Sequence, residues 1–384
     1  MITLEHATKV YPGSSSPAVD DVTLHVPEGE ISVFIGPSGC GKTTLMRMIN
    51  RLTPTTSGVI EVGGKNVMDL DPIELRRGIG YVIQQVGLFP HMTVRDNVAT
   101  VPKLLGWNKS AIDNRVDELL DLIGLDPGVF RSRYPRELSG GQAQRIGVAR
   151  AMAADPPVML MDEPFGAIDP ITREVLQDEF LKIQWQVKKT IIFVTHDISE
   201  AIKMGQKIAL LKDGQLIQYD VPEKLLTAPR NEFVKSFVGT DRALKRLNLL
   251  RVSDAMMTNP VHCQADDPSE KIMEYMIGND LQFLLVTDGE ERLMGYVNLY
   301  DLRGHRGKVG DVVRPMTITV SPEQNLKEAL SRMLGFDLGI VVAVDEDQRL
   351  AGILNSKTLF SVVGDTYDER GGHWGNVTST GRIP

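Results

Sequence analysis

The chain has 384 residues, of which 42% are hydrophobic and 24% charged, a composition typical of a folded protein with room for about two or three domains. Its formal net charge of −8 argues against nucleic acid as the main partner, because neutralising phosphates requires a basic surface. The two cysteines, Cys40 and Cys263, are too few for a disulfide framework and fit a reducing cytosol. The first residues lack the form of a signal peptide, and no apolar run of about 18 residues is present, so we expect any membrane contact to be made through another protein.

The order of apolar patterns indicates an α/β core interrupted by helices. Residues 1–30 alternate between apolar and polar positions, which predicts antiparallel strands with one solvated face. From about residue 78 to 157 the spacing is helical, and we expect a helical subdomain at about 89–157. The apolar runs at 31–35, 158–161 and 191–195 are typical of strands in a parallel sheet covered on both faces, and a hairpin is expected around Asp213 and Gly214.

Residues 36–43, GPSGCGKT, match the phosphate-binding pattern G-x-x-x-x-G-K-[ST] between a predicted strand and a predicted helix. Glycines at three positions of the loop let backbone N–H groups turn inward, and the helix that begins near Lys42 adds the positive end of its dipole. We expect Lys42 to reach the β- and γ-phosphates and the Thr43 hydroxyl to hold Mg²⁺. The sequence therefore predicts a nucleotide site in this loop.

Two further motifs carry groups suited to phosphate chemistry. The run VMLMDE at 158–163 ends in Asp162, placed to bind Mg²⁺, and Glu163, placed to activate a water for attack on the γ-phosphate. The alternative is a strand followed by a solvated acidic turn. The run LSGGQ at 138–142 opens a second glycine-fronted helix, whose N-terminal N–H groups also attract anions. We expect this second helix end to close the other side of a bound triphosphate.

Taken in order, GPSGCGKT, LSGGQ, LMDEP and FVTHD resemble the motifs of the ATP-binding cassette (ABC) ATPases, over about residues 1–240. The resemblance implies a P-loop ABC ATPase core with an antiparallel β subdomain and a helical subdomain, and ATP and Mg²⁺ as cofactors. It also implies a head-to-tail homodimer that sandwiches ATP between the chains. The signature that would meet the γ-phosphate held by the other chain consists of Ser139, Gly140, Gly141 and Gln142.

The resemblance assigns roles to single residues of the nucleotide site. The nucleotide-binding loop would comprise Gly36, Pro37, Ser38, Gly39, Cys40, Gly41, Lys42, Thr43 and Thr44. Nothing in the pattern points to a catalytic thiol at Cys40. Tyr11 resembles the aromatic residue that stacks on adenine, the alternative being a strand-end aromatic without a ligand.

Three further roles follow from the same resemblance. Gln84 resembles the glutamine that links Mg²⁺ and water to the transport partner, with Gln85 as the neighbour that a shifted alignment would choose. His196 resembles the histidine that holds the γ-phosphate, so the implied catalytic set is Glu163, His196 and Gln84. Asp169 lies at the turn through which two chains would contact each other. The implied Mg²⁺ ligands are Thr43, Gln84 and Asp162.

After a basic segment, the chain repeats itself. Residues 242–251 carry four basic and no acidic side chains, and we expect 241–251 to be a linker helix with a solvated basic face; contact with acidic lipid or an acidic partner is the alternative. Nine residues recur 57 positions later, beginning with Val252 and Val309, without a gap. We expect two βαββα-like units at 252–308 and 309–363, forming an α+β domain, and a mobile tail at 364–384.

The two copies resemble tandem cystathionine-β-synthase (CBS) domains, whose ribose-phosphate motif is G-x-x-[ST]-x-x-D. The first copy has Gly295, Asn298 and Asp301, whereas the second has Asn355 and Thr358 in place of the hydroxyl residue and the acid. The candidate ligand contacts are therefore Asn298, Asp301 and Asn355. An adenine nucleotide or cyclic dinucleotide, a dimerisation module without ligand, and the sensing of ionic strength by charged surfaces remain alternatives.

The stretches YVIQQVGLFPHMTVRDNV and PFGAIDPITR resemble the ATPase subunits of importers for glycine betaine, choline, carnitine and related quaternary ammonium osmolytes. The resemblance implies a peripheral ATPase at the cytoplasmic face of the cell membrane, which drives an integral membrane permease and serves an extracytoplasmic substrate-binding protein indirectly. The CBS pair would regulate it. A non-transport ABC ATPase is disfavoured because neither a second cassette nor a long coiled-coil insertion is present. A sensor with a vestigial cassette is disfavoured by the intact Glu163, His196 and LSGGQ.

Overall fold

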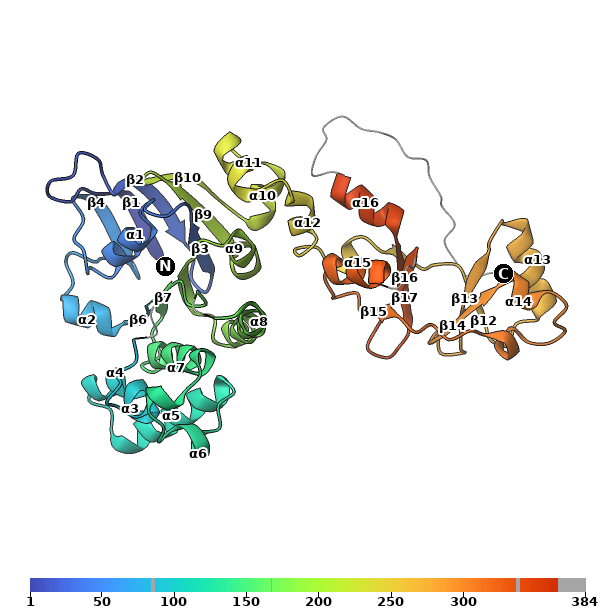
Figure 1. Ribbon diagram of the computed structural model, residues 1–384, viewed down its shortest axis with the longest axis horizontal. Helices are drawn as coiled ribbons and strands as arrows, with labels where there is room; N and C mark the ends of the chain where they lie inside the picture. The colour runs from blue at the N-terminus through green and yellow to red at the C-terminus, as the bar shows by residue number, and fades with distance from the viewer. Residues whose placement is uncertain (84–86, 167, 336–338, 365–384) are drawn as a thin grey trace. The chain divides into compact units, whose positions relative to one another are not determined.

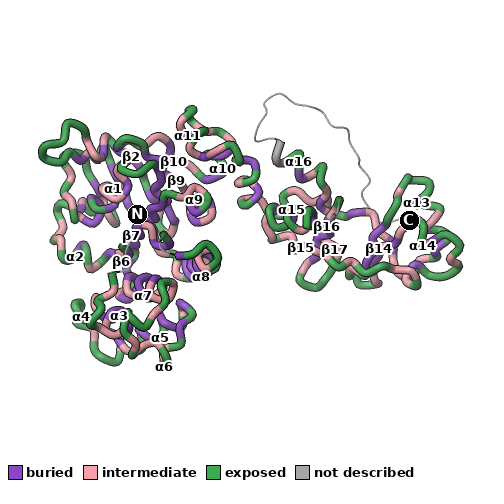
Figure 2. Tube along the Cα trace, viewed as in Figure 1, coloured by how far each residue is buried: buried purple, intermediate pink, exposed green. Residues whose placement is uncertain are grey.

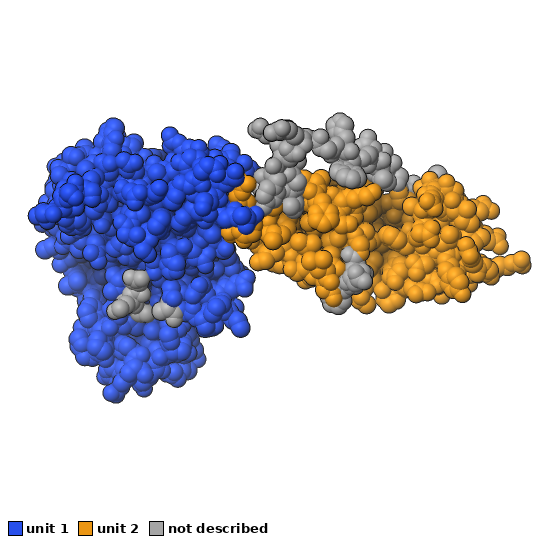
Figure 3. Space-filling model, turned by 45° about the horizontal axis from the view of Figure 1, so that its top comes forward, with its two compact units in different colours: residues 1–240 blue, residues 241–384 orange. Residues whose placement is uncertain are grey.

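The computed structural model describes residues 1–83, 87–166, 168–335 and 339–364 (Figure 1). The chain folds into two compact units, residues 1–240 and residues 241–384 (Figure 3). Within each unit, the buried stretches follow the strands and the inner faces of the helices (Figure 2). Each unit therefore has a hydrophobic core of its own.

A six-stranded sheet forms the centre of the first unit, in the order β10-β9-β3-β8-β7-β6. All neighbouring pairs are parallel except β9 and β10, which form the predicted hairpin. Every residue of β3, β7 and β8 is buried, as the continuous apolar runs predicted. The strands are β3 (Ile31–Ile35), β6 (Ile79–Val82), β7 (Val158–Asp162), β8 (Thr190–Val194), β9 (Lys207–Lys212) and β10 (Gln215–Asp220).

The strand β6 corrects the prediction that the chain is helical from about residue 78. Its four residues, IGYV, pair with β7 in parallel register from Ile79 opposite Val158 to Val82 opposite Met161. Such a short run carries no periodicity of its own, so only the partner strand decides its conformation. The helical region begins after this strand.

A second, antiparallel sheet in the order β2-β1-β4-β5 confirms the predicted alternation at the beginning of the chain. Its strands are β1 (Ile2–Lys9), β2 (Val19–Val26), β4 (Ser57–Val62) and β5 (Lys65–Asn66). One hydrophobic cluster joins the inner face of this sheet to α1 (Lys42–Ile49) and to Phe34 of the central sheet. Because both sheets pack against α1, the helix that follows the phosphate-binding loop is held firmly in place.

The helix α7 connects the helical subdomain to the central sheet, because it contacts β6 and also α3, α5 and α8 (Figure 1). Its helices are α3 (Val94–Val98), α4 (Thr100–Leu104), α5 (Lys109–Leu122), α6 (Pro127–Phe130) and α7 (Gly140–Met152). The remaining helices of the unit are α2 (Pro72–Arg77), α8 (Pro170–Val187), α9 (Ile198–Met204), α10 (Pro222–Thr227) and α11 (Glu232–Val238). A fully buried amide, Asn97, fixes the entry to this subdomain by donating to the carbonyl oxygens of Phe89, Met92 and Thr93.

The second unit contains two β-α-β-β-α modules, as the repeat predicted. The first consists of β12 (His262–Gln264), α13 (Ser269–Gly278), β13 (Phe283–Thr287), β14 (Leu293–Asn298) and α14 (Leu299–Leu302). The second consists of β15 (Thr319–Val320), α15 (Leu326–Gly335), β16 (Ile340–Val344), β17 (Leu350–Asn355) and α16 (Ser356–Gly364). The predicted tail lies outside the described residues from 365 onward.

The leading segment of each sequence repeat packs on the other repeat. The strand β11 (Met257–Thr258) pairs with β17 of the second module, and Arg314, located 57 residues after Met257, bridges Tyr296 of the first. In the same way, Val252 lies in the core of the second module and Val309 in that of the first. Each repeat, with the predicted boundaries 252–308 and 309–363, therefore supplies its leading segment to the core of the other repeat.

The predicted linker at 241–251 differs from the structure. Only α12 (Arg242–Arg246) is helical, and Leu247 beyond it is 1% exposed in the core of the second CBS module. The guanidinium of Arg246 donates to the carbonyl oxygen of Val362 at 2.8 Å, and Lys245 pairs with Asp241 at 2.6 Å. These basic side chains are engaged within the second unit instead of forming a solvated face.

Candidate functional site

The phosphate-binding loop runs from the end of β3 to the beginning of α1 along a path that two glycines make possible. Gly36 has φ 153°, and a Cβ there would lie 2.1 Å from the carbonyl oxygen of Leu211. Gly41 has φ 102°, and its Cβ would lie 2.4 Å from the carbonyl oxygen of Ala18. Any larger residue would push the loop away from its neighbours. The glycine spacing of the motif is thus explained by close backbone approach.

The first residue of α1, Lys42, turns its ammonium group back over the loop. Its Nζ donates to the carbonyl oxygens of Gly36 at 2.8 Å and Pro37 at 3.0 Å, and the side chain is 8% exposed. In the part of the chain that the structure describes, Lys42 forms no ion pair with a carboxylate. A buried cation held by neutral groups is well suited to bind phosphate.

A hydroxyl and a buried carboxylate face each other beside the loop. The Oγ1 of Thr43 lies 3.4 Å from Oδ1 of Asp162, the last residue of β7. Burial raises the pKa of the Asp162 carboxyl above its usual range, the charge of Glu163 adds to this rise, and the hydrogen bond from Thr43 opposes it. Oxygen ligands of this kind suit Mg²⁺, which usually binds one or two protein oxygens together with substrate phosphates. The residues present therefore fit a magnesium ion.

Glu163 and His196 come together from the ends of two neighbouring parallel strands, β7 and β8. Their side chains approach to 3.1 Å between Oε1 of Glu163 and Nδ1 of His196. Glu163 has φ 45°, in the left-handed region, and its N–H donates to the carbonyl oxygen of Val194 at 2.9 Å. This turn directs Glu163 differently from Asp162 before it. The carboxyl ends of the strands thus present a carboxylate and an imidazole beside the phosphate-binding loop.

The signature forms the N-terminus of α7 and is bonded within itself. Ser139 is the N-cap residue and accepts from the N–H of Gln142 at 3.3 Å, while Oε1 of Gln142 accepts from the N–H of Ser139 at 3.0 Å. This reciprocal arrangement is a capping box. A Cβ on Gly140 would meet nothing within 4 Å, and Gly140 does not have a positive φ. Neither local space nor backbone conformation explains a glycine at this position.

Comparison with known proteins identifies both units. The family model described as ABC transporter matches residues 19–166, and the CBS domain model matches residues 252–307 and 309–365. The osmoprotectant import ATP-binding protein OsmV of Salmonella typhimurium is 48% identical over 356 residues, which covers 92% of this chain and 93% of that protein. The chain belongs to the glycine betaine/choline/carnitine importer family of ABC ATP-binding proteins.

Other relatives agree with this assignment. The glycine betaine/carnitine/choline transport ATP-binding protein OpuCA of Bacillus subtilis is 47% identical over 370 residues, covering 95% of this chain and 97% of that protein. Among solved structures, the dimeric ATP-binding cassette MJ0796 bound to ADP and Pi is 35% identical, with a TM-score of 0.52, and covers 58% of this chain and 99% of that chain. In the described part of this family member, no helix is sufficiently long and apolar to cross a membrane.

Several residues that the family resemblance singled out lie outside the assembled cluster. Tyr11 is exposed, and the Nζ of Lys9 lies 5.3 Å from its ring centroid. Asp169 is the N-cap of α8 and accepts from the N–H of Thr172 at 3.0 Å, which lowers the pKa of its carboxyl. Gln84 and its neighbour Gln85 lie outside the described residues. The roles of these residues remain predictions.

Two of the three candidate contacts of the CBS pair, Asp301 and Asn355, are bonded to protein groups. Both carboxylate oxygens of Asp301 accept from Arg314, at 2.7 and 2.6 Å, which lowers the pKa of Asp301. Asn355 accepts from the N–H of Thr358 at 2.9 Å, and Asn298 is an N-cap residue without a side-chain cap bond. A ribose would have to displace Arg314 to reach Asp301.

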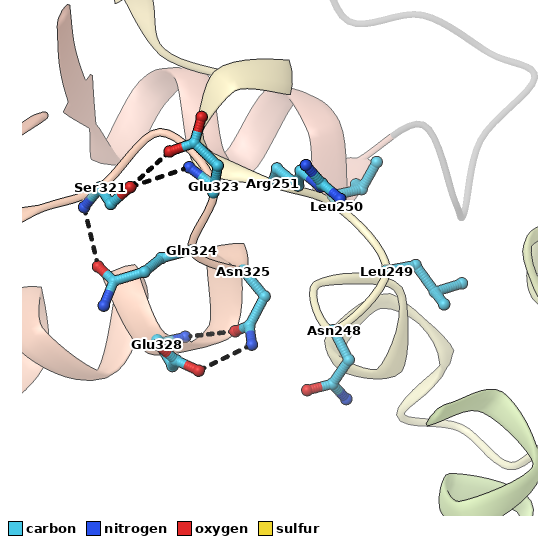
Figure 4. A pocket seen from close by; sticks show the side chains of 9 residues that line it. All are labelled: Asn248, Leu249, Leu250, Arg251, Ser321, Glu323, Gln324, Asn325 and Glu328. Carbon is cyan, nitrogen blue, oxygen red and sulfur yellow. Dashed lines mark hydrogen bonds between the residues drawn. The ribbon is translucent and has the colours of Figure 1, made fainter. Parts of the chain in front are cut away.

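A cavity of about 460 Å³ opens elsewhere in the second unit (Figure 4). Its lining carries both signs of charge and consists of Asn248, Leu249, Leu250, Arg251, Ser321, Glu323, Gln324, Asn325 and Glu328. Two polar pairs in this lining bond to each other, Ser321 to Glu323 at 2.5 Å and Asn325 to Glu328 at 3.0 Å. None of the predicted CBS contacts lines it.

Sequence reasoning missed a buried polar network behind His196. Glu200 of α9 bonds to Thr195 and to Gln177, and all three side chains are buried. The signal available was weak, since Thr195 and Glu200 merely flank His196 in FVTHDISE and Gln177 lies within a polar stretch. Only the approach of α8 to α9 shows that these residues belong together.

Proposed function

We propose that this chain hydrolyses ATP to power an ABC importer of quaternary ammonium osmoprotectants, the class that the names of its relatives describe. The observation that carries the proposal is the cluster at the carboxyl ends of β3, β7 and β8. This site combines a cation suited to phosphate (Lys42) with oxygen ligands suited to a metal ion (Thr43 and Asp162). It also holds a candidate general base, Glu163, and the imidazole of His196.

Each group of the cluster has a defined task. Lys42 and the loop N–H groups bind the β- and γ-phosphates. Thr43 and Asp162 would hold Mg²⁺, which would neutralise negative charge on the phosphate oxygens. Glu163 accepts a proton from the attacking water, and His196 orients Glu163 and contacts the γ-phosphate. By the family resemblance, Gln84 would be a further Mg²⁺ ligand that links the site to the transport partner, and Tyr11 would stack on adenine.

The site is completed by a second copy of the chain. In this arrangement Ser139, Gly140, Gly141 and Gln142 of one chain approach the γ-phosphate bound by the other, and Asp169 contacts the partner near the same point. Two features of the signature support this: Ser139 and Gln142 cap their own helix, and Gly140 is a glycine that neither local space nor backbone conformation requires. The solved structures of MJ0796, which resemble the first unit, are dimers.

The remaining partners follow from the importer assignment. The dimer binds the cytoplasmic face of an integral membrane permease and works indirectly with an extracytoplasmic substrate-binding protein. Substrate selection resides in those partners, because the site described above contacts only the nucleotide. No nucleic acid partner is involved.

The test of this function is the variant Glu163→Gln. Loss of a general base lowers the rate by about 10²–10⁴-fold. The variant keeps every phosphate contact of the loop, so it should bind ATP and accumulate as an ATP-loaded dimer, measured by light scattering at saturating ATP. The control is Glu174→Gln on the exposed face of α8. A Glu163→Gln chain that stayed monomeric with ATP bound would contradict the sandwich.

We also propose that the CBS pair regulates the ATPase. Titration calorimetry of the full-length Lys42→Ala variant with ATP, AMP and cyclic dinucleotides reports tight binding at the pair, because the affinity of the cassette for ATP is lowered. The Asp301–Arg314 ion pair leads us to expect no ribose contact at Asp301. Heat from any of these nucleotides would identify the regulatory ligand. If none of these nucleotides gave heat of binding, dimerisation or the sensing of ionic strength would be left as the role of the pair.

A further inference from the structure

A buried carboxylate bonds to the residue next to His196, which forms the proposed hydrolytic pair with Glu163. Glu200 lies in the first turn of α9 and is 8% exposed. Its Oε2 accepts from the hydroxyl of Thr195, and its Oε1 accepts from Nε2 of Gln177 at 2.9 Å. Burial raises the pKa of Glu200, whereas these two hydrogen bonds lower it. A buried acid is unfavourable for stability unless it is well bonded, so its place here calls for an explanation.

One arm of this network holds the turn that carries His196. The Thr195 hydroxyl that donates to Glu200 also accepts from the N–H of Asp197 at 3.1 Å. The N–H of Thr195 in turn donates to the carbonyl oxygen of Phe34 in β3, at 3.2 Å. The residues on both sides of His196 are thus tied to a single carboxylate. His196 itself is largely exposed, so its direction depends on this backbone anchor.

The other arm reaches α8, the helix that follows Glu163 in the chain. Gln177 lies in the middle of α8 and is buried. On the same helix, Arg173 donates to the carbonyl oxygen of Ile168 at 2.8 Å, and its positive charge favours ionisation of Glu200. Ile168, which lies between Glu163 and α8 in the chain, is therefore bound to the same helix that bonds to Glu200.

We propose that Glu200 is a positioning residue for ATP hydrolysis, which holds His196 against Glu163 through Thr195 on one side and Gln177 on the other. The proposal rests on the roles proposed above for Glu163 and His196. Among the described residues, the side chain of Glu200 bonds to Thr195, which follows β8, and to Gln177 of α8, and not to the nucleotide loop. It acts on the rate of hydrolysis and not on ATP binding.

The experiment measures ATP turnover of the full-length chain assembled with its membrane subunit in liposomes. In Glu200→Ala both arms are lost, and a small misplacement of reacting groups lowers the rate by on the order of 10²-fold. We expect this fall in kcat with the KM for ATP unchanged, because Lys42 and Thr43 keep their contacts. Glu200→Gln preserves the shape and the bond to Gln177, so its kcat should lie between those of Glu200→Ala and the unaltered chain.

A second pair of variants tests the Thr195 arm. Thr195→Val removes the hydroxyl and should lower kcat as Glu200→Ala does, whereas Thr195→Ser keeps the hydroxyl and should restore the rate. Residues in one network show non-additive effects. The double variant Thr195→Val, Glu200→Ala should therefore be hardly slower than either single variant. Should Glu200→Ala fail to fold, the comparison of Thr195→Val with Thr195→Ser decides the matter.

The control separates positioning from stability. Gln218→Ala removes another buried side chain of the first unit, which accepts from the N–H of Arg230 at 2.9 Å and lies in β10. This control should lower the melting temperature without a change in kcat. A normal kcat in both Glu200→Ala and Thr195→Val would overturn the positioning role. Undiminished turnover in Glu163→Gln would instead overturn the proposed hydrolytic site, so the two failures are distinguishable.

Discussion

Lys42 shows how much of this site is decided by a single side chain. Its ammonium group is buried against the carbonyl oxygens of Gly36 and Pro37, and Asp162 lies nearby with a raised pKa. Both groups are held in a state that a phosphate and a magnesium ion would stabilise. In the proposed site, Lys42 would offer its positive charge to the phosphates and Asp162 its negative charge to the magnesium ion.

The first prediction concerns nucleotide affinity. Lys42→Ala removes a charged hydrogen-bond donor, and such bonds contribute about 1.5–3 kcal/mol, so ATP affinity should fall by on the order of 10–100-fold. The control is Lys189→Ala, which removes a half-buried lysine paired with Asp155 at 2.8 Å in the same unit. Calorimetric titration with ATP measures both. Equal affinity of the two variants would show that Lys42 does not bind the phosphates.

The second prediction concerns stability as a function of pH. Burial raises the pKa of Glu200 above the ordinary value of 4.5, so the folded chain favours its protonated form. The contribution of this group to stability is then full below the unfolded pKa and is lost as the pH rises through the folded pKa. The side chain of residue 200 in Glu200→Gln does not titrate, so this variant does not lose that stability as the pH rises.

Between about pH 5 and pH 8, the melting temperature of Glu200→Gln should therefore rise relative to that of the unaltered chain. The same variant is expected to hydrolyse ATP more slowly, so stability and activity change in opposite directions. Glu174→Gln, on the exposed part of α8, serves as the control and should follow the unaltered chain at every pH. If the melting temperatures of all three proteins changed in parallel with pH, the assignment of a raised pKa to Glu200 would be contradicted.

At the scale of elements, the proposed site is divided between two helix ends. The N-terminus of α1 completes the phosphate-binding loop, whereas the N-terminus of α7 belongs to the helical subdomain and is capped by its own Ser139 and Gln142. Helix dipoles favour an anion at both ends. In the proposed dimer, one chain supplies the N-terminus of α1 and the other chain supplies the N-terminus of α7 to the same phosphate group.

Mixed dimers provide the third prediction. Gly140→Asp should fold, because a Cβ at this position meets nothing within 4 Å and an acidic residue suits the first turn of a helix. The added carboxylate should nevertheless repel the γ-phosphate of the partner's ATP and abolish turnover. Lys42→Ala should also be inactive on its own. An equal mixture should regain activity, because mixed dimers contain one site with both an intact loop and an intact signature.

The control for this experiment replaces Lys42→Ala by a chain that carries both substitutions. Mixed dimers then contain no intact site, and turnover should be absent. If each chain instead built its site alone, neither mixture would recover any activity. Phosphate release at saturating ATP is the measurement for both mixtures.

At the scale of the whole molecule, the second unit is stabilised because the leading segment of each repeat packs on the other repeat. Val252 and β11 complete the second module, while Val309 and Arg314 complete the first. The two modules are also joined at their hairpins. There the N–H of Leu293 donates to the carbonyl oxygen of Gln348, 55 positions away, at 2.9 Å. Because each half supplies part of the other's core, the two modules should unfold together.

The fourth prediction tests the segment that was expected to be a linker. Leu247→Ala empties a position that is 1% exposed in the second module and should lower stability by about 2–5 kcal/mol. Leu244→Ala, three residues earlier and 56% exposed, should be nearly neutral. Since a two-unit chain need not unfold in one step, the measurement is amide hydrogen exchange of β16 and β17. Equal protection in both variants would restore the linker interpretation.

The sequence by itself determined the features that depend on neighbours along the chain. The loop at 36–43, the buried strands that end in Asp162 and Val194, and the 57-residue repeat were all predictable, because glycine spacing, apolar runs and recurrence lie within short windows. The same holds for the family resemblance, which the relatives confirm over nearly the whole chain.

Only the tertiary structure decided which distant residues meet. It paired Glu163 with His196, which lie 33 positions apart, and placed Glu200 between β8 and α8 behind them. It also made a strand of residues 79–82 and placed Leu247, which precedes both repeats in the chain, in the core of the second module. The physical reason is common to these cases. Strand pairing and burial are free energies of contact between separate segments, and no local pattern records which partner is chosen.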